Sequence, residues 1–185
     1  MNKKTTEEIL AESFHEVASR KNVNRITVSD IVSNCGLSPA TFYRHFRDKY
    51  DMIAWIYGQK CDEIFHRFDG SPHRKEQIVA EWVSFCMENR DFLINLIQNT
   101  GGYDSFVQKM VEKQVQLIEE DIIFLHGEKA LTEKVHMKIY LYSSGMIRLM
   151  CGWLMGKISA SQDEMADVIL ETVPGAVVPL IIPRK

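Results

Sequence analysis

The sequence predicts an all-α protein, and three observations support this fold class. Apolar residues recur at helical spacing along most of the 185 residues. Serine and threonine residues stand where these segments begin, and glycines or prolines stand where they end, as is typical of helix boundaries. The alternation of apolar and polar residues that marks a half-buried strand is almost absent. A chain of this length can bury a substantial core in one or two domains.

The first two predicted helices lie near the N-terminus. Thr5–Arg20 carries its apolar residues on one face at helical period. Thr27 is a suitable N-cap for a second helix over Val28–Asn34, and Asp30 stands at the capping-box position three residues later. Gly36 ends this short helix.

The next two helices follow at once. Ser38 is an N-cap with Pro39 at the first helical position, and the helix reaches about Phe46. A longer amphipathic helix begins at Asp48, and the Gly-Ser-Pro sequence of residues 70–72 ends it.

The remaining residues predict five more helices, separated by glycine-containing turns or short polar stretches. One of them, Leu131–Lys157, has apolar residues on two faces, which predicts burial on two sides. In order, the five span Arg74–Asn89, Asp91–Gln98, Tyr103–Leu125, Leu131–Lys157 and Ser161–Glu171.

The charge of the chain is distributed unevenly. The composition is that of a globular protein, with 45% hydrophobic and 25% charged residues and a net charge of −3. Residues 1–50 hold eight Lys and Arg against six Asp and Glu, whereas residues 51–185 hold 14 against 19. This asymmetry predicts a basic head on an acidic body, which suits a head that binds nucleic acid.

Several classes of function lack support in the sequence. The four cysteines form no CxxC pair and the six histidines are scattered, so we expect no disulfide, no metal site and no cofactor. No nucleophile elbow or glycine-rich phosphate loop is present, which argues against an enzyme. The N-terminus has no apolar signal segment, and Arg148 interrupts the most apolar stretch, so we expect a cytoplasmic protein that does not enter a membrane.

The residues on either side of Gly36 form the pattern of a helix-turn-helix motif. Two short helices flank the glycine turn, and their apolar residues can pack both against a third helix, which leaves the outer face of the second free for the DNA major groove. Phe42 and Phe46 lie four residues apart and are expected to face inward together, while Tyr43 and Arg44 point elsewhere. The apolar set is Ile31, Val32, Cys35, Leu37 and Phe42.

The stretch TVSDIVSNCGLSPATFYRHFRDKYDM resembles the DNA-binding signature of the TetR family of bacterial transcriptional regulators. The resemblance spans roughly Thr5 to Ile56 and includes the Gly-Leu-Ser turn, the Thr-x-Tyr-x-x-Phe spacing and the lysine that follows. Val32 and Cys35 depart from the alanines usual in the family, at positions that concern packing. The stretch SSGMIRLMCGWLMGKISASQDEMA is similar to a subgroup whose relatives include dihydroxyacetone-kinase operon regulators.

The resemblance implies a domain division and a partner. Residues 1–47 would form the helix-turn-helix DNA-binding domain, and residues 48–185 a helical ligand-binding and dimerisation domain. One recognition helix reads only a few base pairs, so we expect a homodimer on a palindromic operator in double-stranded DNA.

The first turn of the recognition helix is expected to read base edges. Ser38, Pro39, Ala40 and Thr41 match the positions that do so in the family. The small apolar residues among them suit the thymine methyl group, and the threonine can also form a hydrogen bond. Arg44 is left open between a guanine contact, a phosphate contact and a solvent-facing position.

Four further residues are expected to contact phosphates. Tyr43 and His45 match family phosphate contacts, and Lys49 matches a phosphate clamp at the start of the fourth helix. Thr27 can offer its hydroxyl or its backbone N–H at the start of the second helix.

The resemblance also implies a ligand cavity and a two-fold interface in the body. Each of the residues named for these sites is, taken singly, at least as compatible with an ordinary core position. For the inducer cavity we name Trp55, Gln59, Trp82, Phe85, Phe92, Tyr103, Phe106, Tyr142 and Met146. For the dimer interface we name Ile139, Ile147, Leu149, Trp153 and Leu154.

Three functions remain open at this point. The first is a dimeric repressor that a small-molecule ligand releases from its operator. The second is a regulator or activator of the same fold, controlled by a protein partner and lacking a small-molecule cavity. The third is an unrelated helical binding or catalytic protein whose head matches by accident.

Overall fold

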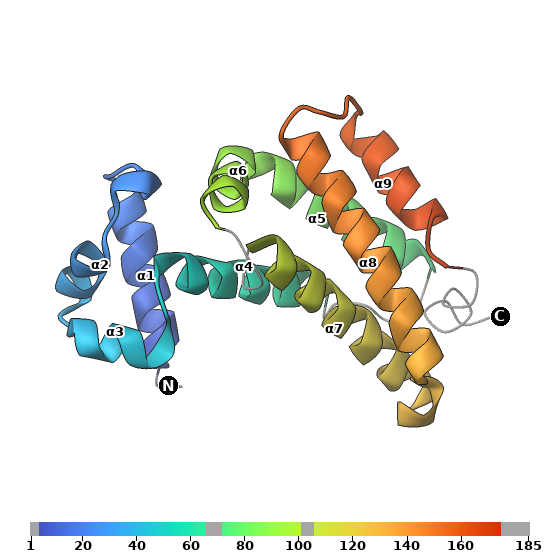
Figure 1. Ribbon diagram of the computed structural model, residues 1–185, viewed down its shortest axis with the longest axis horizontal. Helices are drawn as coiled ribbons and strands as arrows, with labels where there is room; N and C mark the ends of the chain where they lie inside the picture. Colours follow the sequence, from blue (N-terminus) through green and yellow to red (C-terminus); the bar gives the residue numbers. More distant parts are fainter. Residues whose placement is uncertain (1–3, 66–71, 101–105, 175–185) are drawn as a thin grey trace. The chain divides into compact units, whose positions relative to one another are not determined.

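A computed structural model describes residues 4–65, 72–100 and 106–174 of the chain (Figure 1). The described residues form α-helices and two 3₁₀ turns and contain no strand, which confirms the all-α prediction. The structure divides into two compact units, Met1–Tyr57 and Gly58–Lys185. This division falls inside helix α4 (Lys49–Phe65). The boundary that we place at residue 47 stays a prediction.

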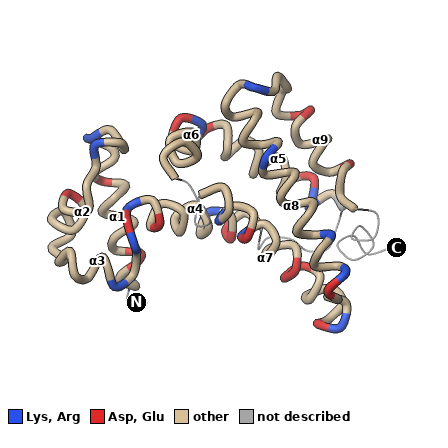
Figure 2. The backbone as a smooth tube through the Cα atoms, in the orientation of Figure 1, with Lys and Arg blue, Asp and Glu red and all other residues tan. Residues whose placement is uncertain are grey.

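The N-terminal unit holds three helices and the first half of α4. Helix α1 comprises Thr6–Ala18 and is followed by the 3₁₀ turn η1, Val23–Arg25. The helix-turn-helix pair is α2, Val28–Cys35, and α3, Pro39–His45. Many charged residues of the N-terminal unit lie on α1 and around the α3–α4 junction, while α2 and α3 carry few (Figure 2).

The boundaries of α2 and α3 depend on hydrogen bonds that the sequence already predicts. Thr27 and Asp30 form a reciprocal capping box at the start of α2. Gly36 ends α2 in the left-handed region at φ 70°, where residues with a Cβ are disfavoured. Ser38 caps α3, with Pro39 at its first position. These predictions are confirmed.

The core of the N-terminal unit positions α3 through its inward face. Phe42 and Phe46 are both buried, as expected, and their ring centroids lie 5.7 Å apart. The buried Ser13 hydroxyl of α1 donates to the Ile31 carbonyl over 2.6 Å, which links α1 to α2. Because three helices share this core, the outer face of α3 remains at the surface.

The C-terminal unit consists of the end of α4 and five further helices. They are α5 (Pro72–Glu88), α6 (Arg90–Asn99), α7 (Phe106–His126), α8 (Glu133–Leu154) and α9 (Gln162–Glu171), with the 3₁₀ turn η2 (Glu128–Ala130) before α8. Helix α7 packs against α8, and α5 packs against α9 (Figure 1). Ser161 caps α9 with Glu164 in a capping box, as the sequence predicts.

Helix α8 is shorter than the predicted segment at both ends. Thr132 caps it, so the residues before it form the separate 3₁₀ turn. The turn after α8 is held by the Trp153 indole, whose N–H donates to the Ala160 carbonyl over 2.8 Å. Two-sided burial is found only in part, because Tyr140 on one of the predicted stripes is exposed.

Candidate nucleic-acid interface and cavity

The first turn of α3 presents the predicted base-reading residues together. Ser38, Pro39 and Ala40 are exposed, and Thr41 is half-buried. The Ser38 hydroxyl accepts from the Thr41 backbone N–H over 3.1 Å, and the two hydroxyl oxygens lie 3.0 Å apart. The N-cap bonds therefore fix the backbone of this turn without covering its surface.

The rest of α3 carries an exposed aromatic residue and two polar ones. Tyr43 is 58% exposed, so its ring and hydroxyl are accessible to a partner. A weak 3.5 Å contact joins the Arg44 guanidinium to the Thr41 hydroxyl. His45 Nδ1 lies 2.8 Å from the Glu7 carboxylate, so a phosphate would compete with that carboxylate for the ring.

Glu7 belongs to the first turn of α1. Backbone hydrogen bonds at this helix start, followed by the bond with His45, lower the pKa of the Glu7 carboxyl below its ordinary value. The carboxylate form is therefore favoured beside His45 at neutral pH.

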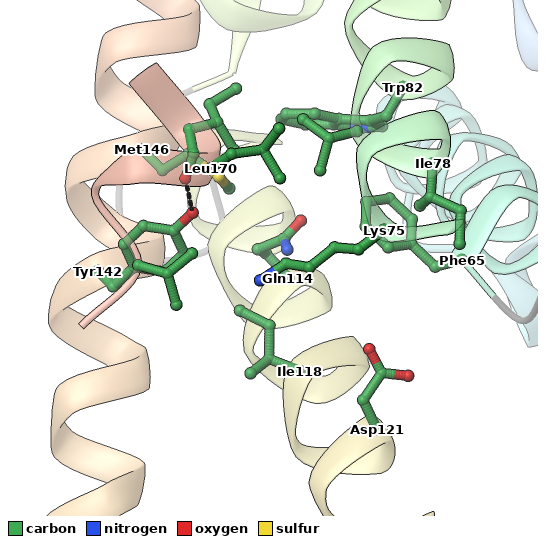
Figure 3. Close-up of a pocket in the computed structure, with 13 residues that line it drawn as sticks. Phe65, Lys75, Ile78, Trp82, Gln114, Ile118, Asp121, Tyr142, Met146 and Leu170 are labelled. Atoms are coloured by element: carbon green, nitrogen blue, oxygen red, sulfur yellow. Dashed lines mark hydrogen bonds between the residues drawn. The ribbon is translucent and has the colours of Figure 1, made fainter. Parts of the chain in front are cut away.

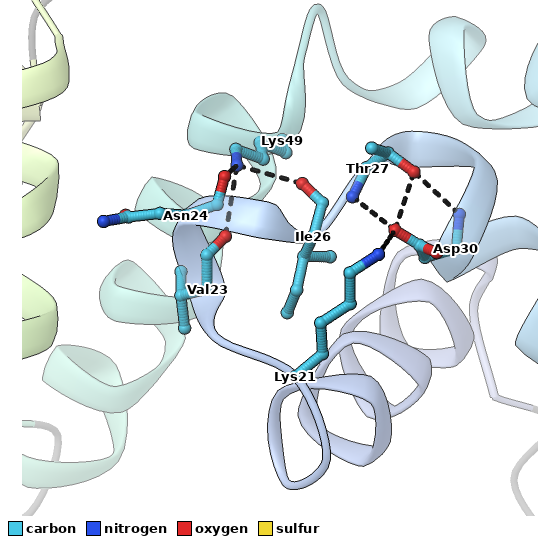
Figure 4. Close-up of polar contacts among 7 residues, drawn as sticks. All are labelled: Lys21, Val23, Asn24, Ile26, Thr27, Asp30 and Lys49. Carbon is cyan, nitrogen blue, oxygen red and sulfur yellow. Dashed lines mark hydrogen bonds and ion pairs between the residues drawn. The ribbon is translucent and has the colours of Figure 1, made fainter.

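Thr27 uses both of its predicted phosphate donors inside the protein. Its backbone N–H and its hydroxyl donate to the same oxygen of Asp30 over 2.8 and 2.7 Å (Figure 4). Lys21 donates to that oxygen over 2.6 Å. The Lys21 bond first, and the Thr27 bonds next, hold the pKa of Asp30 well below its usual range. A phosphate contact by Thr27 would have to share or replace these bonds.

Lys49 likewise directs its ammonium inward. Its Nζ donates to the carbonyl oxygens of Val23, Asn24 and Ile26 over 3.1, 3.2 and 2.9 Å (Figure 4). An ammonium has three donors, and each faces a carbonyl here. Burial, and then repulsion from Lys21, lower the pKa of Lys49. The predicted phosphate clamp stays a prediction, because the described contacts give this residue a structural role.

Most residues predicted for the dimer interface lie inside one protomer. Leu149 is half-buried and the other four are buried. Side chains already covered by their own protomer have little surface left for a partner, and the part of these residues in an interface stays a prediction. Periodicity finds apolar faces of a helix but does not tell which face the protomer itself covers. The four buried residues are Ile139, Ile147, Trp153 and Leu154.

The exposed face of α8 carries a different apolar set. Met137 is 59% exposed and Leu141 75%, with Tyr140 between them also exposed. The sequence of α8 between Lys138 and Arg148 contains no charged residue. Gly145 lies on the same stripe, and a Cβ built there would meet nothing within 4 Å. Met137 and Leu141 were not predicted for the interface, although their spacing of four residues is visible in the sequence.

A cavity in the C-terminal unit lies among the end of α4, α5, α7, α8 and α9 (Figure 3). Its empty volume is about 610 Å³, part of which is open to solvent. Three of the predicted ligand residues, Trp82, Tyr142 and Met146, line it. The Tyr142 hydroxyl donates to the Ile169 carbonyl over 2.7 Å, which fixes its ring at the wall.

Other predicted ligand residues do not line this cavity. Gln59 is exposed, Phe106 is buried in the core, and Phe85 and Phe92 are half-buried elsewhere. Trp55 belongs to the N-terminal unit, where its ring centroid lies 5.9 Å from that of Phe46. Tyr103 lies outside the described residues. Aromatic content alone did not separate core residues from wall residues.

The sequence reading missed three polar residues of the cavity wall, Lys75, Gln114 and Asp121. A signal for them existed in the helical spacing. Lys75 lies three, four and seven residues before Ile78, Val79 and Trp82, and so shares their face of α5. A polar residue on an apolar helix face is more informative than a further aromatic one.

The described residues contain no group of three or more His, Cys, Asp or Glu side chains arranged to hold a metal ion. None of the helices in those residues combines the length and hydropathy that a membrane crossing requires.

Comparison with known proteins connects the N-terminal helices to one family. The family described as "Bacterial regulatory proteins, tetR family" matches residues 9–55. The HTH-type dhaKLM operon transcriptional activator DhaS of Lactococcus lactis subsp. lactis (strain IL1403) is 26% identical over 61 residues, 33% of each chain. The uncharacterized HTH-type transcriptional regulator YerO of Bacillus subtilis (strain 168) is 23% identical over 188 aligned positions. These span 92% of this chain and 63% of YerO.

A solved structure shares the whole fold. The dihydroxyacetone kinase operon activator DhaS superposes with a TM-score of 0.58 at 15% identity, over 93% of this chain and 96% of that one. At this identity the likeness concerns the fold alone. The family match covers α1, α2, α3 and the start of α4, the elements that hold the exposed face of α3 in place. Residues 9–55, and with them the helix-turn-helix helices α2 and α3, therefore match the tetR family of bacterial regulatory proteins.

Proposed function

We propose that the protein is a homodimeric repressor that binds a palindromic operator and is released from it by a small-molecule ligand. The observation that carries the ligand part is the cavity of the C-terminal unit, with its apolar walls and few polar groups. Small-molecule sites are typically concave and mostly apolar, with a small number of polar groups that orient the ligand.

The exposed first turn of α3 supports sequence reading. Pro39, Ala40 and Thr41 would contact base edges, while Tyr43 and His45 would contact phosphates. Within the described residues Arg44 makes one weak contact, to the Thr41 hydroxyl, so its guanidinium is available for a phosphate or a guanine. Ser38 contributes by holding the turn in shape.

The exposed stripe of Met137, Tyr140, Leu141 and Gly145 on α8 supports dimerisation. Contiguous exposed apolar surface marks an interaction site, and a glycine lets a partner helix approach closely. A two-fold interface through this stripe would bring two α3 helices to one palindromic operator.

Helix α4 is the element through which a ligand would act. It begins at Lys49, which is bonded to the turn before α2, and ends at Phe65, which lines the cavity. A ligand that changes the position of Phe65 would change the DNA affinity only if it binds one state of α4 more tightly than the other.

Activation instead of repression is a second candidate. Its support is the likeness to DhaS, in sequence and in fold, because that protein is an operon activator. In this case a protein partner would control the regulator and the cavity would have no inducer.

The deciding experiment is footprinting on the DNA upstream of the protein's own gene, combined with transcription in vitro. A repressor protects a palindromic site that overlaps the promoter and lowers transcript yield. An activator protects an upstream site and raises it. Absence of any protected site on this DNA would contradict both candidates for this promoter.

A further inference from the structure

A lysine side chain occupies the cavity of the C-terminal unit. Lys75 leaves α5 beside Ile78 and Trp82, and its chain extends across the cavity toward Gln114 (Figure 3). An ammonium held among apolar walls is poorly solvated, and burial lowers the pKa of Lys75 to about 8 despite the opposing attraction of Asp121. The group is therefore still mostly charged at neutral pH.

Among the described residues, neither the Lys75 ammonium nor the Gln114 amide forms a hydrogen bond with another group of the chain. Gln114 is only 8% exposed, and Figure 3 shows its amide turned into the cavity. Buried polar groups are nearly always hydrogen-bonded, and leaving one unpaired costs free energy. The half-buried Lys75 ammonium and the Gln114 amide face the same cavity, so one ligand can pair with both.

We propose that this cavity binds an apolar monocarboxylic acid, whose carboxylate is held by the Lys75 ammonium and the Gln114 amide. The inference rests on the proposed function of the cavity as the ligand site and names the chemical class of that ligand. A carboxylate offers two acceptor oxygens, one for the ammonium and one for the amide N–H, and hydrogen bonds between charged groups are the stronger ones.

The charges around the cavity favour a single negative charge on the ligand. Lys75 supplies one positive charge, whereas Asp121 on α7 would repel a second negative charge such as that of a phosphate dianion. A cationic ligand would place its charge beside the lysine. Tyr142 already donates its O–H to Ile169, so it adds no further donor for an anion.

The remaining wall requires an apolar ligand body. Phe65, Val79, Trp82, Ile118 and Met146 surround the polar groups, and burying an alkyl or aromatic chain against them contributes roughly 25 cal/mol per Å². A small polar acid would leave this surface in contact with water, so affinity should increase with the length of the chain until the cavity is filled.

The test measures binding of matched probes to the full chain by calorimetry, with no DNA present. The probes are the straight-chain carboxylates from butanoate to dodecanoate, and the amide and the amine of the best-binding length. We expect the acid to bind at least about tenfold more tightly than its amide, with the amine weakest. Equal affinity of acid and amide, or no binding by any acid of the series, overturns the proposal.

Two variants assign the effect to the named groups. Lys75→Met should remove the preference for acid over amide, because it keeps the alkyl stem and deletes the charge. Gln114→Leu should lower the affinity for the acid severalfold and leave the preference for acid over amide, which depends on Lys75, in place. Lys134→Met, at an exposed position on α8, is the matched control and should change nothing. A preference that survives Lys75→Met also overturns the proposal.

Failure of this inference can be told apart from failure of the proposed function. If the acid binds through Lys75 but does not alter operator affinity, the ligand class stands and ligand control of DNA binding is wrong. If a neutral compound releases the protein from the operator while acids do not bind, ligand control of DNA binding stands and the proposed ligand class is wrong.

Discussion

The Lys49 ammonium lies 2.9 Å from the Ile26 carbonyl oxygen, and this bond ties the start of α4 to the turn that precedes α2. Two more carbonyls of the same turn accept from the same nitrogen. A residue that the sequence identifies with a phosphate clamp is thus a cross-link between elements of the N-terminal unit.

Lys49→Met should therefore destabilise the protein as well as change its DNA binding. We expect the free energy of unfolding to fall by about 1–2 kcal/mol, since hydrogen bonds of a charged donor are lost. Urea unfolding measures this, with Lys60→Met on the exposed face of α4 as control. If Lys49 also contacts a phosphate, the salt dependence of operator binding should lose about one unit of slope. An unchanged slope would leave Lys49 with its structural role alone.

Tyr43 and Thr41 should affect DNA binding in different ways. Tyr43→Ala removes an exposed side chain, so stability should hardly change while affinity for all sequences falls by about 1 kcal/mol. Thr41→Val should instead change which operator is preferred, since its hydroxyl is expected to face base edges. Fluorescence anisotropy on random and operator DNA, together with selection from random DNA, separates the two effects. A uniform loss for Thr41→Val would remove it from base reading.

Leu141 and Ile147 form a matched pair for the dimer interface. Both lie on α8, but the first is 75% exposed in the protomer and the second only 1%. Leu141→Asp should yield a folded monomer in analytical ultracentrifugation, because it charges the proposed contact surface without disturbing the core. Ile147→Asp should unfold the protein, because it buries a carboxylate without a partner. A stable dimer of Leu141→Asp would exclude this stripe as the interface.

Lys75→Met should stabilise the ligand-free protein at neutral pH. The folded-state pKa of Lys75 is about 8, below the ordinary value of 10.5. Below pH 8 the side chain is charged in both states, and its burial costs stability. Between pH 8 and 10.5 the unfolded state binds more protons, so stability rises with pH and the cost disappears. We expect a gain on the order of 1 kcal/mol at pH 7 after allowance for partial exposure, and almost none at pH 10.5.

Denaturant unfolding at the two pH values checks this prediction, with Lys134→Met as control. The other titratable groups at the cavity are Asp121 on α7 and Tyr142 on α8, and both remain in the variant. A gain that is the same at both pH values would show that packing, and not the charge of Lys75, is responsible.

The sequence predicts the N-terminal helices well because their limits depend on local chemistry. A threonine or serine cap, a glycine in the left-handed region and two phenylalanines four residues apart each act within one or two turns. The role of Lys49 could not be read in this way, because its partners, such as Ile26, are brought close only by the fold. The Thr27 bonds to Asp30 are local and follow from the capping box, but the bond of Lys21 to the same Asp30 oxygen does not.

The C-terminal unit was harder to predict, because helical periodicity identifies the apolar faces of a helix but not the elements that pack against them. Trp153 and Leu141 are both apolar residues of α8, yet Trp153 lies in the core and Leu141 at the surface. The sequence analysis names mainly aromatic residues for the cavity and does not predict its polar wall residues. Lys75 and Gln114 become informative only when both are seen to face the same cavity.

In the first turn of α3, the residue that stabilises the fold differs from a residue that is expected to select the operator. The bonds that hold its first turn use the Ser38 hydroxyl and backbone groups, while the side chain of Ala40 points to solvent. Substitutions at that position therefore have little effect on the stability of the head. After gene duplication, a copy of this regulator can acquire a new target site through such a change, without a compensating mutation elsewhere in the chain.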